Sequence, residues 1–161
     1  MSNIRVGLGF DVHQLAKERR FILGGVEILT EKGLLGHSDA DVLIHAICDA
    51  LLGAANLRDI GYHFPNNTNE FKDADSKVLL KRVSHLLHEK NYRIINVDAT
   101  VVAEKPKINP YIPEMQNVLS TCMNISADDV SIKATTNERL GFIGREEGIT
   151  AYAVALIEKR N

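Results

Sequence analysis

The stretch Asp39-Ala40-Asp41-Val42-Leu43-Ile44-His45-Ala46-Ile47-Cys48-Asp49-Ala50-Leu51-Leu52-Gly53-Ala54-Ala55 decides the fold of this 161-residue chain. Apolar residues recur in it at intervals of three and four, as on one face of an amphipathic helix: Val42, Leu43, Ala46, Ile47, Ala50, Leu51 and Ala54. Before them, Ser38-x-x-Asp41 matches a capping pattern that marks a helix N-terminus. The stretch predicts a capped helix with one apolar face to bury.

Strands are predicted on the N-terminal side of this helix. Ile4 to Phe10 is an apolar run typical of a strand, and so is Phe21 to Ile28, which Gly24-Gly25 interrupts. The polar segment Gln14 to Arg20 is expected to join these strands as a pair. Gly33 to Gly36 then predicts a turn.

The C-terminal side begins with a long polar segment. Residues 56 to 74 are rich in Asn, Asp and Gly, and such a loop in a compact domain is typical of a lid or a binding segment. The elements predicted beyond it are a helix at Asp75–Lys90, a strand at Arg93–Ala103, a helix at Pro110–Met123, a strand at Asp129–Thr135 and a buried strand at Ile149–Ile157. Periodicity alone does not exclude a helix for the last of these.

The order ββ-α-α-β-α-β-β predicts an α+β fold, in which residues 1–161 form a single-domain sandwich of one β-sheet with helices on one face. The formal charge of −2 offers no basic surface for nucleic acid. Cys48 and Cys122 are isolated in apolar helical patterns, which favours a reducing compartment. Neither a signal segment nor a membrane-spanning run is expected, so the predicted location is cytoplasmic.

Asp11 and His13 follow the first predicted strand. Side chains two residues apart in a strand point to the same side, so this pair presents an oxygen and a nitrogen donor that Zn²⁺ readily uses. The alternative is a strand end at which the aspartate caps a turn and the histidine is merely exposed.

His45 is the histidine of the quoted helix. It lies one helical turn from Asp41 and from Asp49, as in metal sites where a carboxylate orients the bound histidine. The alternative is a half-buried histidine that these aspartates satisfy without metal. Asp11, His13 and His45 together would leave one tetrahedral position open, which is the pattern of a catalytic zinc site.

Two further clusters have the chemistry to bind phosphate. His37 and Ser38 precede the predicted helix N-terminus, where free backbone N–H groups favour anions, although Ser38 alone as a cap is an equal alternative. Thr135-x-x-Glu138 carries a hydroxyl and a carboxylate that suit Mg²⁺ or Mn²⁺, and it also matches a capping box. Lys105 and Lys107, by default, are solvated surface charges.

These motifs together resemble the 2-C-methyl-D-erythritol 2,4-cyclodiphosphate synthase family. The resemblance runs from end to end, in order and with matching spacing. It rests on Gly9-Phe10-Asp11-Val12-His13, Gly33-Leu34-Leu35-Gly36-His37-Ser38-Asp39-Ala40-Asp41-Val42, Asp49-Ala50-Leu51-Leu52-Gly53-Ala54-Ala55, Asp59-Ile60-Gly61 and Lys133-Ala134-Thr135-Thr136-Asn137-Glu138-Arg139-Leu140-Gly141-Phe142.

The resemblance implies an enzyme of the non-mevalonate isoprenoid pathway. Such an enzyme converts 4-diphosphocytidyl-2-C-methyl-D-erythritol 2-phosphate to the cyclic diphosphate and releases CMP, as a homotrimer with active sites between subunits. Carried over by position, Asp11, His13 and His45 match the zinc ligands, and Glu138 matches the residue that faces Mg²⁺ or Mn²⁺. His37 and Thr136 match the transition-state stabilisers.

The same resemblance implies a set of substrate-binding residues. They are Asp11, His13, His37 and Ser38; Asp59, Ile60 and Gly61 for the methylerythritol part; Phe64, Pro65, Asn66, Asn67 and Thr68 in the following loop; Ala103, Glu104, Lys105, Pro106, Lys107, Ile108, Asn109 and Thr135 for cytidine; and Thr136, Asn137, Glu138, Phe142 and Arg145. Asn66-Asn67-Thr68 departs from the family, which often has acidic residues there, and Arg139 stands where lysine is common.

Two rival functions fit parts of the pattern. A zinc phosphohydrolase would use metal-bound water in place of the internal phosphate, and its product would be linear rather than cyclic. A non-catalytic trimer would bind isoprenoid diphosphates near Arg145 as a sensor. The complete set of zinc-binding and hydroxyl positions argues for catalysis.

Overall fold

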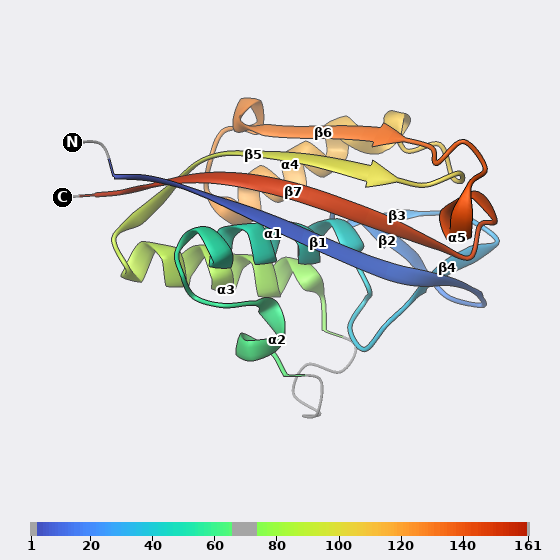
Figure 1. Cartoon of the computed structure of the whole chain (residues 1–161), viewed down its shortest axis with the longest axis horizontal. Helices are drawn as coiled ribbons and strands as arrows, with labels where there is room; N and C mark the ends of the chain where they lie inside the picture. Colours follow the sequence, from blue (N-terminus) through green and yellow to red (C-terminus); the bar gives the residue numbers. More distant parts are fainter. Residues whose placement is uncertain (1–2, 66–73, 161) are drawn as a thin grey trace.

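The computed structural model describes residues 3–65 and 74–160, and its centre is a five-stranded sheet (Figure 1). The strands are β1 (Ile4–Lys17), β4 (Lys32–Leu35), β5 (Tyr92–Val102), β6 (Val130–Thr135) and β7 (Gly148–Lys159). They lie in the order β4-β1-β7-β5-β6, and the β5–β6 pairing is parallel while the other three are antiparallel. The sheet is therefore mixed, in agreement with the α+β class.

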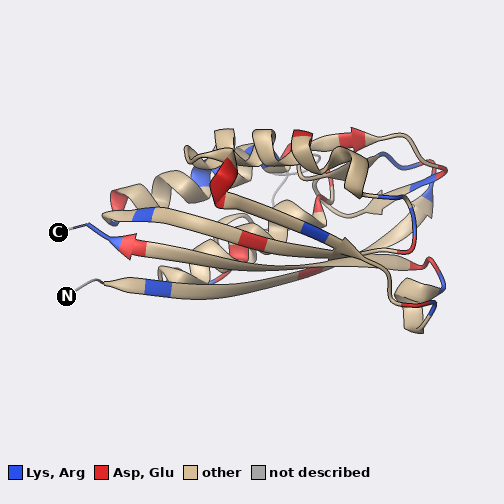
Figure 2. Cartoon of the chain, turned by 90° about the horizontal axis from the view of Figure 1, so that it is seen from above, with Lys and Arg blue, Asp and Glu red and all other residues tan. Residues whose placement is uncertain are grey.

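Helices cover one face of this sheet (Figure 2). The three long ones are α1 (Val42–Ala54), α3 (Ser76–Glu89) and α4 (Ile112–Met123), and they confirm the helices expected from periodicity. Two short helices, α2 (Ile60–His63) and α5 (Gly141–Gly144), and two 3-10 turns (Asn109–Tyr111 and Ala127–Asp129) complete the helical elements described. Pro113 lies in the first turn of α4, as predicted.

The segment after the first strand differs from the prediction. Phe21–Leu23 (β2) and Val26–Ile28 (β3) pair with each other as a separate hairpin, and β1 pairs with β4 and β7 instead. The reason is the turn between them, where Gly24 and Gly25 have φ of +57° and +75°, values that L side chains rarely adopt. The run therefore folds back on itself.

Two further boundaries were wrong. β1 does not end at Phe10 but continues to Lys17, because its backbone stays paired with β7 as far as Gln14 and then with β4. Gly33 lies in strand β4 opposite Ala16, rather than in a turn. A Cβ at Gly33 would lie 2.1 Å from the carbonyl oxygen of Arg19, so this glycine serves a close backbone approach.

The core lies between the sheet and the helices. Leu43, Ile47 and Leu51 of α1 are fully buried, as is Ile149 of β7. Cys48 and Cys122 are buried, unpaired thiols. Within the described ranges, no helix has the length and apolar character needed to cross a membrane.

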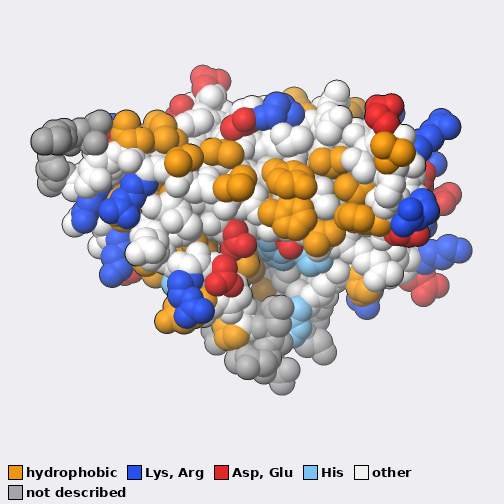
Figure 3. Space-filling model, in the orientation of Figure 1, with side chains coloured by type: hydrophobic (Ala, Val, Ile, Leu, Met, Phe, Trp, Pro, Cys, Tyr) orange, Lys and Arg blue, Asp and Glu red, His pale blue; other side chains and the backbone are white. Residues whose placement is uncertain are grey.

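On the other face of the sheet, the part formed by β1 and β7 carries exposed apolar side chains (Figure 3). Its exposed side chains alternate with buried ones along β1 and β7: Val6, Leu8, Phe10, Val12, Tyr152 and Val154 are each between 42% and 70% exposed. β7 is therefore a strand, as predicted, but in the single chain only the face toward the helices is buried. A continuous group of exposed large apolar side chains is typical of a protein interface.

Candidate active site

The site depends on how closely α1 approaches β1. A Cβ at Gly7 would lie 2.0 Å from the carbonyl oxygen of Ala50, and a Cβ at Gly9 would lie 1.9 Å from that of Ala46. The helix thus packs against bare backbone. Because strand side chains alternate, the next residues on this face of β1 are Asp11 and His13.

Asp11 and His13 meet His45 of α1 at this point. Asp11 Oδ2 lies 3.0 Å from His13 Nε2 and 3.0 Å from His45 Nδ1, and the two ring nitrogens are 3.2 Å apart. Both Asp11 and His13 lie within β1 rather than beyond its end. The predicted convergence of these three side chains is confirmed.

The spacing of the three donor atoms fits a small tetrahedral metal ion. Two ligands bound to zinc at 2.0–2.1 Å with a tetrahedral angle between them are about 3.3 Å apart. The distances of 3.0–3.2 Å are slightly shorter than this value and close to it. Two imidazoles and one carboxylate are also the ligand types that zinc takes in catalytic sites.

Interactions with the two histidines favour the ionised form of Asp11. Burial opposes ionisation of Asp11, but hydrogen bonds and charge interactions with His13 and His45 outweigh it and lower the pKa of Asp11 to about 2. Burial also works against the charged form of His13, yet Asp11 raises the pKa of His13 overall. His13 Nδ1 lies 3.0 Å from the backbone oxygen of Leu35, which fixes the other side of its ring.

The partners of His45 differ from those expected. Its Nε2 lies 3.2 Å from Ser38 Oγ and 3.0 Å from Ser76 Oγ, whereas the prediction placed Asp41 and Asp49 beside the ring. Ser76 was missed because it lies 31 residues away, at the start of α3. A serine that opens a predicted helix is an ordinary cap in sequence terms and gives no sign of this contact.

Asp41 and Asp49 serve the backbone instead. Asp41 is fully buried and accepts hydrogen bonds from the N–H groups of Gly24, Gly25 and Ile44. Asp41, not Ser38, is therefore the N-cap of α1. Asp49 accepts the N–H of Ile60 at 2.7 Å and so holds the start of α2 against α1.

A cavity of about 160 Å³ opens beside the three donors, and it brings together several residues implied by the resemblance. It is lined by Asp11, His13, His37, Ser38, His45, Asp49, Ile60, Gly61, Phe64 and Leu79. His37 Nε2 is buried and has no hydrogen-bond partner within the described residues, so it can serve a ligand. Asp59 directly precedes α2, and Asn66, Asn67 and Thr68 lie outside the described residues.

The remaining expected residues form a second group at the β5–β6 edge. Lys105, Pro106 and Lys107 line a separate cavity of about 500 Å³ together with Lys32 and other residues. Ala103 and Ile108 are buried, so that these two positions offer mainly backbone atoms.

Glu104 ties this loop to the one after β6. Its Oε1 accepts the N–H groups of Asn137 and Arg139, both at 3.0 Å. Thr136 Oγ1 donates to Glu138 Oε1 at 3.0 Å, and Glu138 is exposed. The capping box predicted at Thr135 is wrong, because the next helix begins only at Gly141.

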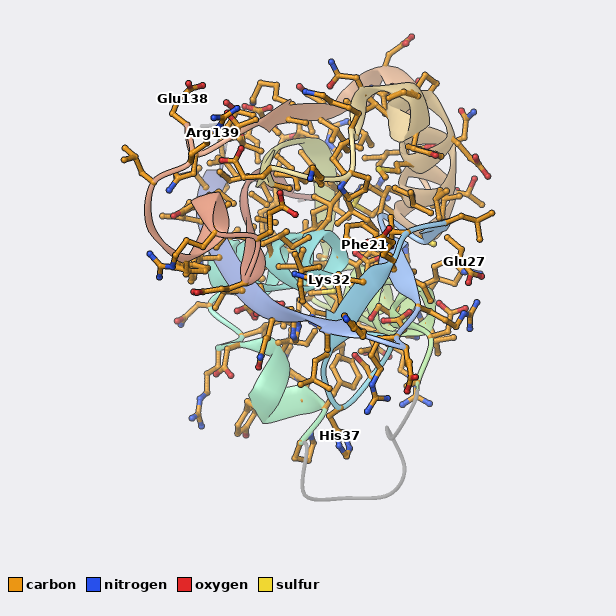
Figure 4. All side chains as sticks on the ribbon, turned by 90° about the vertical axis from the view of Figure 1, so that its right-hand side faces the viewer. Phe21, Glu27, Lys32, His37, Glu138 and Arg139 are labelled. Atoms are coloured by element: carbon orange, nitrogen blue, oxygen red, sulfur yellow. The ribbon has the colours of Figure 1, made fainter. Side chains whose placement is uncertain are left out.

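The two groups do not meet within one chain. Thr135 lies on β6, three strands from β1 in the sheet order, which corresponds to roughly 14 Å. Figure 4 shows Glu138 and His37 at opposite ends of the view. Phe142 and Arg145 belong to the turn around α5, where Arg145 forms a two-point ion pair with Glu147.

Comparison with known proteins agrees with this geometry. The model of the YgbB family matches residues 4–158. A 2-C-methyl-D-erythritol 2,4-cyclodiphosphate synthase from Bacteroides fragilis is 64% identical over 156 residues, which cover 97% of this chain and 98% of that protein.

Two solved structures have the same fold. The bifunctional IspDF from Campylobacter jejuni has a TM-score of 0.96 and 38% identity, and the match covers 100% of this chain but 44% of that one. The CDP complex of IspF from Plasmodium falciparum has a TM-score of 0.86 and 37% identity, and the match covers 99% of this chain and 98% of that one. The chain belongs to the YgbB family.

Proposed function

We propose that this chain converts 4-diphosphocytidyl-2-C-methyl-D-erythritol 2-phosphate to 2-C-methyl-D-erythritol 2,4-cyclodiphosphate with release of CMP, as a phosphorus-oxygen lyase. The observation that carries the proposal is the convergence of Asp11, His13 and His45 at 3.0–3.2 Å beside the cavity that His37 lines. The high identity to a synthase of that name over almost the whole chain supports the substrate.

In this proposal the three donors hold Zn²⁺, and the exposed carboxylate of Glu138 faces Mg²⁺ or Mn²⁺ on the substrate. Ile60 and Gly61, which line the cavity, and Asp59, which directly precedes them, hold the methylerythritol part. The loop from Ala103 to Asn109 and Thr135 receive cytidine, in keeping with the CDP bound by the Plasmodium relative.

A homotrimer joins the two groups of residues. Since roughly 14 Å of sheet separates them in one chain, a second copy has to supply the Glu138 group to the metal donors. The open apolar face of β1 and β7 is the surface that such an assembly would cover. The active site then lies between neighbouring subunits.

The chemistry requires positioning more than base catalysis. An oxygen of the 2-phosphate attacks the β-phosphorus, the bond to the α-phosphate oxygen breaks, and CMP leaves with that electron pair. The attacking phosphate is already an anion, so no strong general base is needed, and the enzyme has to fold a flexible charged substrate and neutralise charge. When bound, zinc supplies positive charge that aligns and polarises the attacked phosphate.

His37 and Thr136 donate hydrogen bonds in the proposed transition state. His37 lines the cavity, and its buried Nε2 has no hydrogen-bond partner among the described residues. In the proposed assembly Thr136 comes from the neighbouring copy. In the single chain its hydroxyl donates a hydrogen bond to Glu138. Loss of one such donor typically costs about 10²-fold or more in rate.

The test is to incubate the purified chain and its His45→Ala variant with the diphosphocytidyl substrate and Mg²⁺, with and without a zinc chelator, and to identify both products. We expect CMP and a cyclic diphosphate from the untreated parent alone, with the variant still assembled in sedimentation. A linear phosphate product would identify a hydrolase instead. CMP release by His45→Ala at the parent rate would contradict the zinc assignment.

A further inference from the structure

The ring nitrogen of His45 that faces away from Asp11 ends a chain of hydrogen bonds that the proposed reaction does not use. His45 Nε2 lies 3.0 Å from Ser76 Oγ, and Ser76 Oγ in turn donates to Asp39 Oδ1. The backbone N–H of Ser76 donates to the other oxygen of the same carboxylate, Asp39 Oδ2, at 2.9 Å. Ser76 is fully buried.

The chemistry of these groups fixes the direction of each bond. An ionised carboxylate only accepts, so the single hydroxyl proton of Ser76 points to Asp39. The lone pairs of Ser76 Oγ therefore face His45, and Nε2 has to carry the proton that is donated to them. With a metal bound, the lone pair of the neutral imidazole is then on Nδ1, the nitrogen that lies 3.0 Å from Asp11 Oδ2 in this structure.

We propose that Ser76 and Asp39 are positioning residues that hold His45 in the tautomer and ring orientation needed to bind a metal through Nδ1. The inference rests on the proposed function, because it concerns the affinity of the same metal site. Partners of this kind behind a ligating histidine typically change metal affinity by about 10- to 100-fold.

Ser38 is the competing partner of the same nitrogen. Its Oγ is 3.2 Å from His45 Nε2 and accepts the N–H of Ala40, but no carboxylate among the described residues takes its proton. The hydroxyl of Ser38 is thus free to donate or to accept, and it does not determine where the proton of His45 lies. Ser76 does determine it, because the hydroxyl of Ser76 already donates its hydrogen bond to Asp39.

A purely structural role of Ser76 and Asp39 can be distinguished from the proposed positioning of His45. Asp39 also clamps the start of α3 to the segment before α1, through the backbone of Ser76 and through the Asp39 N–H bond to Ala74 O at 3.2 Å. Ser76→Ala removes the hydroxyl but keeps both backbone bonds of this clamp. The metal-free fold should therefore survive the substitution while the metal affinity falls.

Asp39→Asn tests the direction of the hydrogen bond between Ser76 Oγ and His45 Nε2 more sharply. Two backbone N–H groups donate to the Asp39 carboxylate, and that of Ser76 is nearer at 2.9 Å than that of Asp41 at 3.3 Å. The amide oxygen of the asparagine therefore turns to the Ser76 N–H, and the amide NH₂ faces Ser76 Oγ. The hydroxyl proton of Ser76 is then turned toward His45 Nε2, the reverse of its parent direction. We expect this variant to bind metal at least as weakly as Ser76→Ala.

The experiment measures zinc affinity of the full chain by competition with a chromogenic chelator, and the melting temperature of the metal-free chain. We expect zinc to bind about 10- to 100-fold more weakly to Ser76→Ala and Asp39→Asn than to the parent, with the metal-free melting temperature of Ser76→Ala unchanged. Asp75→Asn is the matched control, because Asp75 caps the same helix without touching His45, and its zinc affinity should match the parent.

The results separate this inference from the proposed function. A parent chain that binds no zinc would overturn both. A parent that binds zinc, with Ser76→Ala and Asp39→Asn within about threefold of it, would overturn the positioning role alone. So would a larger loss of affinity in Ser38→Ala than in Ser76→Ala, because that result assigns the proton of His45 to Ser38.

Discussion

Asp11 and His13 show what residue spacing can predict and where it stops. The alternation of a strand was enough to place both donors on one side, and the structure confirms it. Helical spacing gave the wrong partners for His45, because the turn at Gly24 and Gly25 presents N–H groups that capture Asp41. That turn lies 16 or 17 residues from Asp41, and no local pattern connects the two.

Asp41 should make stability depend on pH. Burial raises the pKa of Asp41 from 3.8 to about 6, so the folded chain holds this proton more tightly than the unfolded chain does. The stability gained in this way is present at low pH and is lost as pH rises from about 3.8 to about 6. In Asp41→Asn this dependence disappears, so the difference in unfolding free energy between parent and variant should shrink over this range.

Urea unfolding of the metal-free chain at several pH values between about 4 and 7 measures this difference. Asp98→Asn is the control, because hydrogen bonding to Lys133 lowers the pKa of Asp98 and confines its effect to pH below about 3.8, so its difference from the parent should stay nearly constant in this range. An Asp41→Asn difference that stays constant or grows with pH would contradict the prediction.

The elements themselves were predictable where one periodicity dominates. The helices α1, α3 and α4 each have an apolar face, and their predicted positions are confirmed. β1 was predicted too short because its second half carries polar residues, and only backbone pairing with β7 and β4 keeps it extended. Such pairing joins residues far apart in sequence and leaves no local pattern.

The contact between β1 and α1 should be intolerant of a single methyl group. In Gly9→Ala the new Cβ would meet backbone atoms of Ala46 and Ala50, which cannot move aside as a side chain can. We expect a loss of about 1–3 kcal/mol or more in the free energy of unfolding, together with weaker zinc binding, because α1 carries His45 away from β1.

Gly53→Ala is the matched control on the same helix. Gly53 is exposed, and a Cβ there would meet no atom within 4 Å, so that alanine should stabilise the helix by about 0.5–1 kcal/mol. Denaturant unfolding of both variants measures the two changes. Equal effects of the two substitutions would disprove the role assigned to the close approach.

The expected site residues fall into two separate groups in the whole molecule. The family resemblance implied active sites between subunits, but it did not say which residues belong to which group. In one chain, Asp11, His13 and His45 lie at β1 and α1, while Thr136 and Glu138 lie beyond β6. Nothing in the spacing of these residues indicates which of them meet within a chain and which meet across an interface. That information depends on the exposed face of the sheet.

Mixing two inactive variants should therefore restore activity. In the proposed shared site, His45→Ala lacks the metal half and Glu138→Ala lacks the other half, so each variant should be inactive when it assembles alone. In proposed trimers assembled at random from equal amounts of both, about a quarter of the interfaces pair two intact halves. We expect about a quarter of the parent CMP release after joint refolding, whereas activity no higher than that of the separate variants would exclude a shared site.

The alternation of side chains along β1 has a consequence for how this sequence can change. One side of the strand carries Gly7, Gly9, Asp11 and His13 toward α1, and the other carries Val6, Leu8, Phe10 and Val12 outward. Inserting or deleting one residue in β1 would exchange the two sides for every position beyond the change. Substitutions can adjust catalysis and assembly separately, but a change in the length of β1 disables both at once.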